Sequence, residues 1–535
     1  MAKTSYTSTE FSPSSLSRNL AFGGLVFTYI VGVAFICAGI AITVKPRVEY
    51  QMTSAAREVI ALFISFVVFI CNESVGFIHS TALKWDLLNE NRLEFNSNLR
   101  FIQHSSKSWP NGIIFNFIYA IAFALSYSAA PVFFASYFKI NSELFSMSYD
   151  EATSSGDADT VTTLQVFSAS AAYLLGVSFL IQAIISTVCL RISKIGTWNA
   201  SALATARVAC TLGHISRQEG RCMVSVSGSR KSGARNSEYA FPKQLPFLRT
   251  RGQTKLTFCV IVLVLMGLVS GTIGMFARCG MDYVQWTFIA PAPTYMSYYN
   301  KGILTVAFRI YDDNDDDILS ESDAFVAIWV VTCTQLVIAM GIHCAELHVL
   351  SYRDEMIWRQ LASKKGSSPN YSVLFGTVKY WPALILSLYK PIFHWLYGMA
   401  MYVDYQYGLL LNPPQFLTVS IFWLFLVVFI AIVSSLKFKG PLPATYGHLQ
   451  TIANIIDVWE PRMYWGHKSV EELWDSGSDI YDDDMDKITI YDSEASFDEA
   501  KSQYTEHKSP DKIGHAGTSH IFNLVDVISF DYPYK

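Results

Sequence analysis

The sequence predicts an all-α integral membrane protein with eight transmembrane helices. Three observations favour this class: long apolar segments recur along the chain, charged residues are scarce, and the loops alternate between basic and acidic. Over half of the 535 residues are hydrophobic and only 16% are charged, whereas about 25% are charged in a typical soluble domain. A soluble protein of this length would need more charged surface.

Each of the eight apolar segments is long enough to cross a bilayer. A helix rises about 1.5 Å per residue, so about 20 apolar residues cover the roughly 30 Å of hydrocarbon. The expected spans are 20–44, 56–79, 112–138, 165–190, 256–276, 324–346, 381–403 and 416–436. The apolar region of a signal peptide is about 7 to 15 residues long, so we expect the first span to remain as an uncleaved anchor after a cytosolic tail, 1–19.

The loop charges predict the orientation, because lysine and arginine are retained on the cytosolic side of a membrane. The segment 191–255 is strongly basic and contains only two acids, Glu219 and Glu238, so it is predicted to be cytosolic. The loop 277–322 is acidic and is predicted to lie outside. Both termini are then cytosolic, and orientation explains the basic segment better than binding to anionic lipid or nucleic acid does. No nucleic-acid partner is expected.

The acidic outer loop contains a pattern that resembles an EF-hand. Calcium is bound by six to eight oxygens, and a twelve-residue loop with donors at alternate positions supplies them. The candidate ligands are Asp312, Asn314, Asp316, the Ile318 carbonyl, Ser320 and Asp323. Two departures predict weak binding: Asp317 replaces the usual glycine and Asp323 replaces the usual glutamate. The alternative is an acidic loop in which Asp323 caps the next helix. Calcium is the only cofactor that the sequence suggests.

Five ionisable residues within or beside the predicted spans are candidate functional residues, because charges are rare inside a membrane and often functional. They are Glu73, His343, Glu346, Lys390 and His394. His343 and Glu346 share a helix face because they are three residues apart, and Lys390 and His394 share one because they are four apart. Counting residues from the span ends places Glu73, His343, Glu346 and Lys390 in the cytosolic half of the bilayer, where they are able to meet.

This group has a functional and a structural interpretation. In the first, Glu73 and Lys390 form an ion-coupled solute site that opens to the cytosol, beside a helix break at Pro391. In the second, they form a structural ion pair, or Lys390 and Glu346 extend to the membrane surface. Elsewhere, Gly267, Gly271 and Gly274 in the fifth span predict close helix packing.

The chain becomes polar after the last span, in the cytosolic segment 437–535. Apolar residues at helical spacing predict an amphipathic helix near 445–459 that docks on the bundle. From Glu471 onward the composition is acidic and poor in packing residues, which predicts disorder. We expect this tail to bind cytosolic protein partners or to be regulated by modification.

Several short segments resemble multi-spanning integral membrane proteins of filamentous fungi to which no activity is assigned. The segments are His343-Cys-Ala-Glu-Leu, Arg353-Asp-Glu, Pro443-Ala-Thr-Tyr-Gly-His-Leu-Gln-Thr and Tyr464-Trp-Gly-His. The resemblance implies a fungal origin and implies no chemistry. Separately, the multi-pass character predicts an integral protein of the plasma membrane or of a secretory-pathway membrane.

Three function classes remain open from the sequence. The favoured one is a multi-pass membrane scaffold or sensor with a weak calcium-binding outer loop. The alternative is a secondary transporter of a small solute or ion that uses the Glu/Lys/His group. The third, an intramembrane hydrolase, is disfavoured because no nucleotide-binding loop, zinc-type cysteine pair or other catalytic signature is present. The protein is therefore predicted not to be an enzyme, and its oligomeric state is open.

Overall fold

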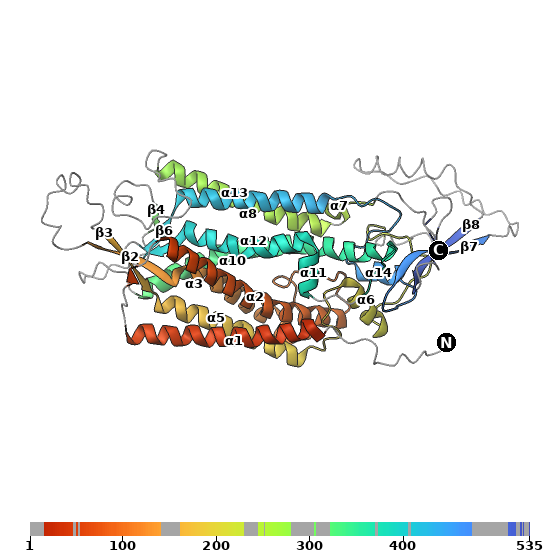
Figure 1. Ribbon diagram of the computed structural model, residues 1–535, viewed down its shortest axis with the longest axis horizontal. Coiled ribbons are helices and arrows are strands. Elements are labelled where there is room, and N and C mark those ends of the chain that lie inside the picture. Colours follow the sequence, from red (N-terminus) through yellow and green to blue (C-terminus); the bar gives the residue numbers. More distant parts are fainter. Residues whose placement is uncertain are drawn as a thin grey trace.

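The protein is a bundle of long helices that run side by side along the longest axis of the molecule (Figure 1). The computed structural model describes residues 15–45, 50–51, 54–140, 161–228, 244–250, 252–279, 304–306, 321–369, 373–404, 408–472, 512–520, 525, 526, 528 and 534. Seven of the described helices are long and apolar enough to cross a membrane. The chain is thus an integral, multi-pass membrane protein in contact with the lipid bilayer.

Eight helices form this bundle. They are α1 (Ser15–Val44), α2 (Ser54–Asn89), α3 (Ile113–Val132), α5 (Ala169–Ile192), α8 (Gly252–Cys279), α10 (Glu321–Arg359), α12 (Trp381–Ala400) and α13 (Pro413–Ser435). Helix α12 is the one that is absent from the seven apolar spans. It contains Lys390, Pro391 and His394, which reduce its hydropathy, yet it lies parallel to the others within the bundle (Figure 1).

The bundle consists of two groups of four helices. Helices α1, α2, α3 and α5 pack mainly on one another, as do α8, α10, α12 and α13. The groups meet where α10 packs on α3 and α5 and where α12 packs on α2 and α3. Five helices, α2, α3, α5, α10 and α12, therefore border the interface between the two groups.

Glycines permit the closest helix approach in the first group. A Cβ added at Gly176 of α5 would lie 2.7 Å from the Gly32 carbonyl of α1, so the two backbones are in direct contact. The predicted close packing of the fifth span is wrong within this chain, because a Cβ at Gly267, Gly271 or Gly274 would meet no described atom within 4 Å. Those three glycines instead lie on an exposed face of α8.

The connections are sorted between the two ends of the bundle. At one end, β1 (Tyr50–Gln51), β2 (Phe134–Ile140) and β3 (Val161–Phe167) form an antiparallel sheet in the order β1-β3-β2. Beside it lie β4 (Leu304–Val306), β5 (Met401–Asp404) and β6 (Gly408–Leu411), in the order β4-β6-β5 (Figure 1). Several connections were predicted to lie outside the cell. Their described residues are all at this end of the bundle.

The strands correct the predicted boundaries of three spans. Residues 134–138 and 165–167 were predicted to be helical, but they pair as strands, with Phe134 opposite Phe167. Residues 401–403, the predicted end of the seventh span, belong to β5. The physical reason is local: Pro131 lies in the last turn of α3, and the aromatic and β-branched residues that follow favour extended chain. Apolarity alone did not distinguish these strands from helix.

A compact assembly of shorter elements lies at the opposite end of the bundle. We call it the end domain; it comprises residues 193–228, 440–472 and 512–520, the described residues 525, 526, 528 and 534, and the projecting ends of α2 and α10. Its elements are α6 (Ala202–Thr211), α14 (Leu449–Ile455), β7 (Tyr464–Glu472) and β8 (Lys512–Ser519). Trp85, Trp358, Leu449 and Tyr534 are among the residues of its separate core. Figure 1 shows α7 (Phe247–Thr250) and α11 (Val373–Lys379) nearby, and two 3₁₀ helices cover Trp109–Asn111 and Gln360–Ala362.

The end domain corrects two expectations for the tail. Disorder was predicted from Glu471 to the end, but 512–519 form β8, which pairs antiparallel with β7, and Tyr534 is fully buried. The average composition of the tail is acidic, so it gave no sign of the few apolar residues, such as Ala516 and Ile528, that pack in the core of the end domain. The predicted helix at 445–459 is reduced to Leu449–Ile455. Residues 473–511 lie outside the described residues.

Candidate functional site

Lys390 connects the two halves of the bundle through ion pairs with two carboxylates. Its Nζ donates to Glu73 Oε1 at 2.7 Å and to Glu346 Oε1 at 3.0 Å. On the other side of Glu346, Oε2 lies 3.2 Å from His343 Nδ1. Glu73 comes from α2 of the first helix group, whereas Lys390 on α12 and Glu346 on α10 come from the second. We call these four residues, with His394, the charge cluster.

Burial differs sharply within the charge cluster. Only 9% of the Lys390 side chain is exposed, whereas 22% of Glu346 and 35% of Glu73 are exposed. A charged side chain at the centre of a bilayer costs roughly 3 kcal/mol or more, so the buried ammonium requires its two partners. The two carboxylates are thus less enclosed than the ammonium group that they hold.

A small cavity of about 10 Å³ adjoins the charge cluster. It is lined by Glu73, Arg100, Phe101, Phe123, Tyr127, Ala339, Ile342, His343, Glu346, Lys390 and His394. This volume is close to the minimum that holds one water-sized species. His343 Nε2 is buried and has no hydrogen-bond partner among the described residues, so one polar atom of the lining is left to bind something small.

His394 is held at the edge of the cavity by its neighbours. Its ring stacks on Tyr127 with centroids 3.6 Å apart, and its Nδ1 lies 3.0 Å from Gln335 Oε1. The following turn is fixed by the Tyr397 hydroxyl, which donates to Thr334 Oγ1 at 2.8 Å. Pro391 lacks the N–H that would bond the Ser387 carbonyl, so α12 is weakened beside the charge it presents.

Arg100 is the charged cavity residue that sequence reasoning missed. It lies on the connection between α2 and α3, in a turn where Ile102 and Gln103 donate their N–H groups to the Leu99 carbonyl. A Cβ added at Gly76 would overlap the Arg100 guanidinium, so this connection enters the bundle beside α2. Arg100 is only 6% exposed. No local pattern in the sequence marks a turn that re-enters the bundle.

The five residues predicted from spacing and position all line one cavity. Helical periodicity placed His343 with Glu346 and Lys390 with His394, and counting from the span ends placed Glu73 at the same depth. The structure brings these three segments together at the interface of the two helix groups. The sequence contained no signal for Arg100, Tyr127 or Gln335, because nothing in their local patterns relates them to the charges.

A second buried ion pair lies toward the strand-bearing end of the same interface. Arg57 Nη2 donates to Glu58 Oε1 at 2.6 Å, and Trp395 Nε1 of α12 donates to Glu58 Oε2 at 3.1 Å. Both charged side chains are at most 10% exposed. The contact between α2 and α12 is therefore tied by hydrogen bonds near the start of α2 as well as at Glu73.

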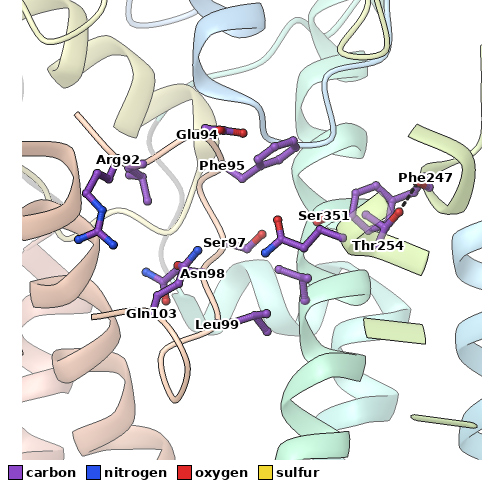
Figure 2. A pocket seen from close by; sticks show the side chains of 13 residues that line it. Arg92, Glu94, Phe95, Ser97, Asn98, Leu99, Gln103, Phe247, Thr254 and Ser351 are labelled. Carbon is purple, nitrogen blue, oxygen red and sulfur yellow. Dashed lines mark hydrogen bonds between the residues drawn. The ribbon is translucent and has the colours of Figure 1, made fainter. Parts of the chain in front are cut away.

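A larger cavity of about 250 Å³ lies on the end-domain side (Figure 2). Its polar and charged side chains come from three segments: Arg92, Glu94, Ser97, Asn98 and Gln103 from the α2–α3 connection, Gln253 and Thr254 from α8, and Ser351 from α10. Leu99 and Leu347 also line it, and their chain neighbours Arg100 and Glu346 line the small cavity. One layer of chain thus separates a polar vestibule from the charge cluster.

The end domain also buries carboxylates, but their hydrogen bonds are complete. Glu355 Oε2 accepts from the Thr445 and Tyr446 N–H groups, both at 2.8 Å, and from Thr445 Oγ1 at 3.1 Å. Its Oε1 accepts from Arg359 Nε at 2.7 Å. This carboxylate joins α10 to the segment that precedes α14, and both of its oxygens are used.

The candidate calcium ligands cannot be placed. Asp312, Asn314, Asp316, Ile318 and Ser320 lie outside the described residues, and Asp323 lies in α10 with its side chain outside them. In the described part of the chain, no group of three or more His, Cys, Asp and Glu residues is arranged to hold a metal ion.

Comparison of the chain with protein-family models, with curated proteins and with solved structures finds no match. The functional argument therefore rests on the geometry of the charge cluster and its surroundings.

Proposed function

We propose that the protein is a secondary transporter in which the charge cluster binds and releases a proton together with a small solute. The observation that carries this proposal is the placement of Lys390 between Glu73 and Glu346, across the interface of two four-helix groups. Transporters commonly bind their substrates at such interfaces, where rocking of one group against the other exposes the site alternately. Ion pairs across the interface re-form or break in that motion.

The surroundings of the cluster support a site that opens toward the end domain. The polar vestibule lies on that side, one layer of chain away, and the hydrogen-bonded Arg57–Glu58–Trp395 group ties the opposite part of the α2–α12 contact. A purely structural ion pair needs neither an adjoining cavity nor an unpartnered His343 Nε2. Partial exposure of Glu73 and Glu346 gives a proton access to them.

Transport is tested with purified protein in liposomes that contain a pH-sensitive dye. A panel of inorganic anions, amino acids and monosaccharides is added outside, and solute-dependent proton entry is recorded. We expect at least one compound to produce a flux that Glu73→Gln and Lys390→Met each abolish, because each removes one member of the exchangeable ion pair.

Matched controls make the same chemical changes at exposed positions of the same end of the molecule. Glu219→Gln and Lys107→Met alter side chains that lie on the surface, and they should leave the flux unchanged. A flux that survives both Glu73→Gln and Lys390→Met would remove the charge cluster from the mechanism. Absence of flux with every compound of the panel would count against transport itself.

We further propose that α12 completes a set of eight spans, with the end domain and both termini in the cytosol of a plasma-membrane or secretory-pathway protein. Support comes from charge: the described parts of the basic segment 191–255 lie at the end-domain side, and β2, β3 and β4, which border the acidic loops in the sequence, lie at the opposite end (Figure 1). Asn72 and Asn199 begin glycosylation sequons but are at most 2% exposed, which agrees with their placement in a span and in the cytosol. An antibody that reaches a C-terminal tag on intact cells would contradict this orientation.

A scaffold or sensor role is the second candidate, and the end domain is the observation that favours it. Its own buried core, separate from that of the bundle, provides a folded cytosolic platform rather than a loose tail. If this is the main role, affinity capture with the full chain should recover partners that are lost when 512–535 are deleted. Transport that persists in the same deletion would assign the platform to a separate task.

A further inference from the structure

We propose that the small cavity is an anion site in which Arg100 binds a small anion, such as chloride, when a proton occupies the charge cluster. This inference deepens the proposed function by naming the class of solute, and its coupling to the proton rests on that function. The binding site itself rests on Arg100 and is tested separately below.

Arg100 is a buried cation whose hydrogen-bonding capacity is unused. Its guanidinium makes no hydrogen bond or ion pair with any described residue, and its Nε is fully buried without a partner. It is held instead between aromatic faces, with Cζ 4.9 Å from the Phe101 ring centre and 5.5 Å from that of Phe123. Because an arginine presents five donors and cannot be deprotonated in a protein, such a residue lining a cavity indicates an absent anionic partner.

The cavity presents a second donor for the same ligand. His343 Nε2 lines the same space without a partner, while its Nδ1 faces the Glu346 carboxylate. A neutral imidazole carries its proton on one nitrogen only. If His343 carries it on Nε2, then Nδ1 is an acceptor. A hydrogen bond between Nδ1 and Glu346 then requires that Glu346 supply the proton. Protonation of Glu346 therefore turns His343 into an anion donor beside Arg100. The cavity volume of about 10 Å³ restricts the occupant to a species of near-atomic size.

Charge balance gives the coupling. With Glu73 and Glu346 ionised, their two negative charges cancel those of Lys390 and Arg100, and the site has no net attraction for an anion. One added proton leaves a net positive charge in a poorly solvated space, which an anion then neutralises. By linkage, the proton raises anion affinity and the anion raises proton affinity by the same factor. The two enter and leave together as a neutral pair.

Ionisable groups on four helices face Arg100. From α2 these are Glu73 and His79, from α3 Tyr119 and Tyr127, from α10 His343 and Glu346, and from α12 Lys390. The test must therefore separate the carboxylates from the histidines. Replacement of a carboxylate by its amide mimics the protonated acid, so Glu73→Gln should bind the anion without needing a proton.

Anion binding is measured on the full-length protein in detergent by NMR line broadening of the chloride resonance, with bromide as the competitor. We expect broadening that increases as the pH is lowered and is abolished by bromide. Arg100→Gln should reduce chloride affinity by at least about tenfold, the effect of losing a charge-assisted contact. Arg100→Lys should retain part of it, and Lys107→Gln, on the same connection, should change nothing.

Two further variants protect the test against misfolding. Gly76→Ala keeps the guanidinium but displaces it, because the new methyl group overlaps it, and it should weaken chloride binding. Glu73→Gln should strengthen binding at neutral pH and flatten its pH dependence. Weaker binding in Glu73→Gln, or bromide-sensitive broadening that Arg100→Gln leaves intact, would overturn the proposal.

The liposome measurement distinguishes this inference from the proposed function. Chloride binding that depends on Arg100, without proton flux, would keep the anion site and reject transport. Proton flux with a neutral solute that is unaffected by Arg100→Gln would keep transport and reject the anion site. Chloride-driven proton entry that is lost in Arg100→Gln supports both.

Discussion

Two carboxylates on the same helix, Glu355 and Glu346, lie in different kinds of environment. Glu355 is completely buried and accepts four hydrogen bonds, two of them from backbone N–H groups of the end domain. Glu346, nine residues earlier on α10, is 22% exposed and pairs with side chains only, Lys390 and His343. One helix thus connects a fixed polar network with an adjustable one.

The difference indicates which charges hold the fold and which are available for function. Backbone donors cannot withdraw from Glu355 without unfolding the segment they belong to, so that carboxylate is locked in one state. Lys390 and His343 have rotatable side chains beside a cavity, so Glu346 can exchange partners or take a proton while the helices stay folded. Incomplete satisfaction of a buried polar group usually has a functional reason.

The largest stability effect is expected from Glu355→Ala. This change leaves the Thr445 and Tyr446 N–H groups and the Arg359 guanidinium without their acceptor, and breaking a buried charged network in this way costs about 3–5 kcal/mol. The end domain should then open more often, and limited proteolysis of the full chain should cut within 440–472 much faster. Glu219→Ala, an exposed control, should stay within about 0.5 kcal/mol of the wild type. If Glu355→Ala and Glu219→Ala were cut at the same rate, the hydrogen bonds of Glu355 would not hold the end domain, and its network would be no more fixed than that of Glu346.

A smaller effect is expected in the charge cluster, where partners can rearrange. Lys390→Met leaves two facing carboxylates, whereas adding Glu346→Gln removes one of them, so the double variant should be more stable than the sum of the single effects. Contacting charges couple by about 1–3 kcal/mol in such cycles. Thermal unfolding in detergent of the four proteins measures the coupling. Strict additivity would show that Lys390 and Glu346 do not interact energetically.

Features of the fold and of the charge cluster that depend on local sequence could be predicted, whereas features that depend on contacts between distant segments could not. The helices are predicted from the length of each apolar segment. The end of the bundle at which each connection lies is predicted from the charge of that loop. Both are local properties of the sequence. The depth of Glu73, Glu346 and Lys390 also follows from counting residues along helices. These residues come into contact if α2, α10 and α12 are neighbours in the bundle.

Arg100 and the end domain required information that no local pattern contains. Arg100 reaches the cavity because the α2–α3 connection turns back toward Gly76, which is decided by tertiary contacts. The end domain forms because Trp85, Trp358 and Tyr534, from three distant parts of the chain, share one core. A composition average over the tail predicts its solubility and misses the few residues that dock it.

Within the end domain, Asp457 should contribute an intermediate amount by docking β8. Its Oδ1 accepts from Thr518 N at 2.6 Å and Oγ1 at 2.9 Å, and its Oδ2 accepts from Lys468 at 2.7 Å. Burial alone would raise its pKa, but the Lys468 and Thr518 contacts outweigh it and hold the pKa below the usual range. Asp457→Ala should speed hydrogen exchange in β8 by the equivalent of about 1–2 kcal/mol.

The matched control for β8 is Lys468→Ala. It removes only a half-exposed ion pair, for which about 0–1 kcal/mol is typical, and it leaves both Thr518 contacts in place. Hydrogen exchange of β8 that responds as strongly to Lys468→Ala as to Asp457→Ala would show that the ion pair, rather than the buried hydrogen bonds, docks the strand.

The smallest effect is expected at Glu90, just beyond the end of α2. Burial raises the pKa of this carboxyl, but hydrogen bonds from Ser105, Lys107 N–H, Arg92 and Ser106 outweigh it and lower the pKa from 4.5 to about 2. Because the folded-state pKa is depressed, the stabilisation is complete above about pH 4.5 and is lost as the pH falls toward about 2. Hydrogen exchange at the Ser106 and Lys107 amides, corrected for intrinsic rates, should therefore accelerate over that interval.

Glu90→Gln separates this local effect from general acid unfolding. The amide cannot titrate, so exchange at Ser106 and Lys107 should be faster than in the wild type at neutral pH and should lose its dependence on pH between about 4.5 and about 2. If both proteins lost protection in parallel as the pH fell, the acid response would belong to other carboxylates. Glu90 would then act like an ordinary surface acid, and the α2–α3 connection that carries Arg100 would be held in place by its remaining contacts, including the close packing against Gly76.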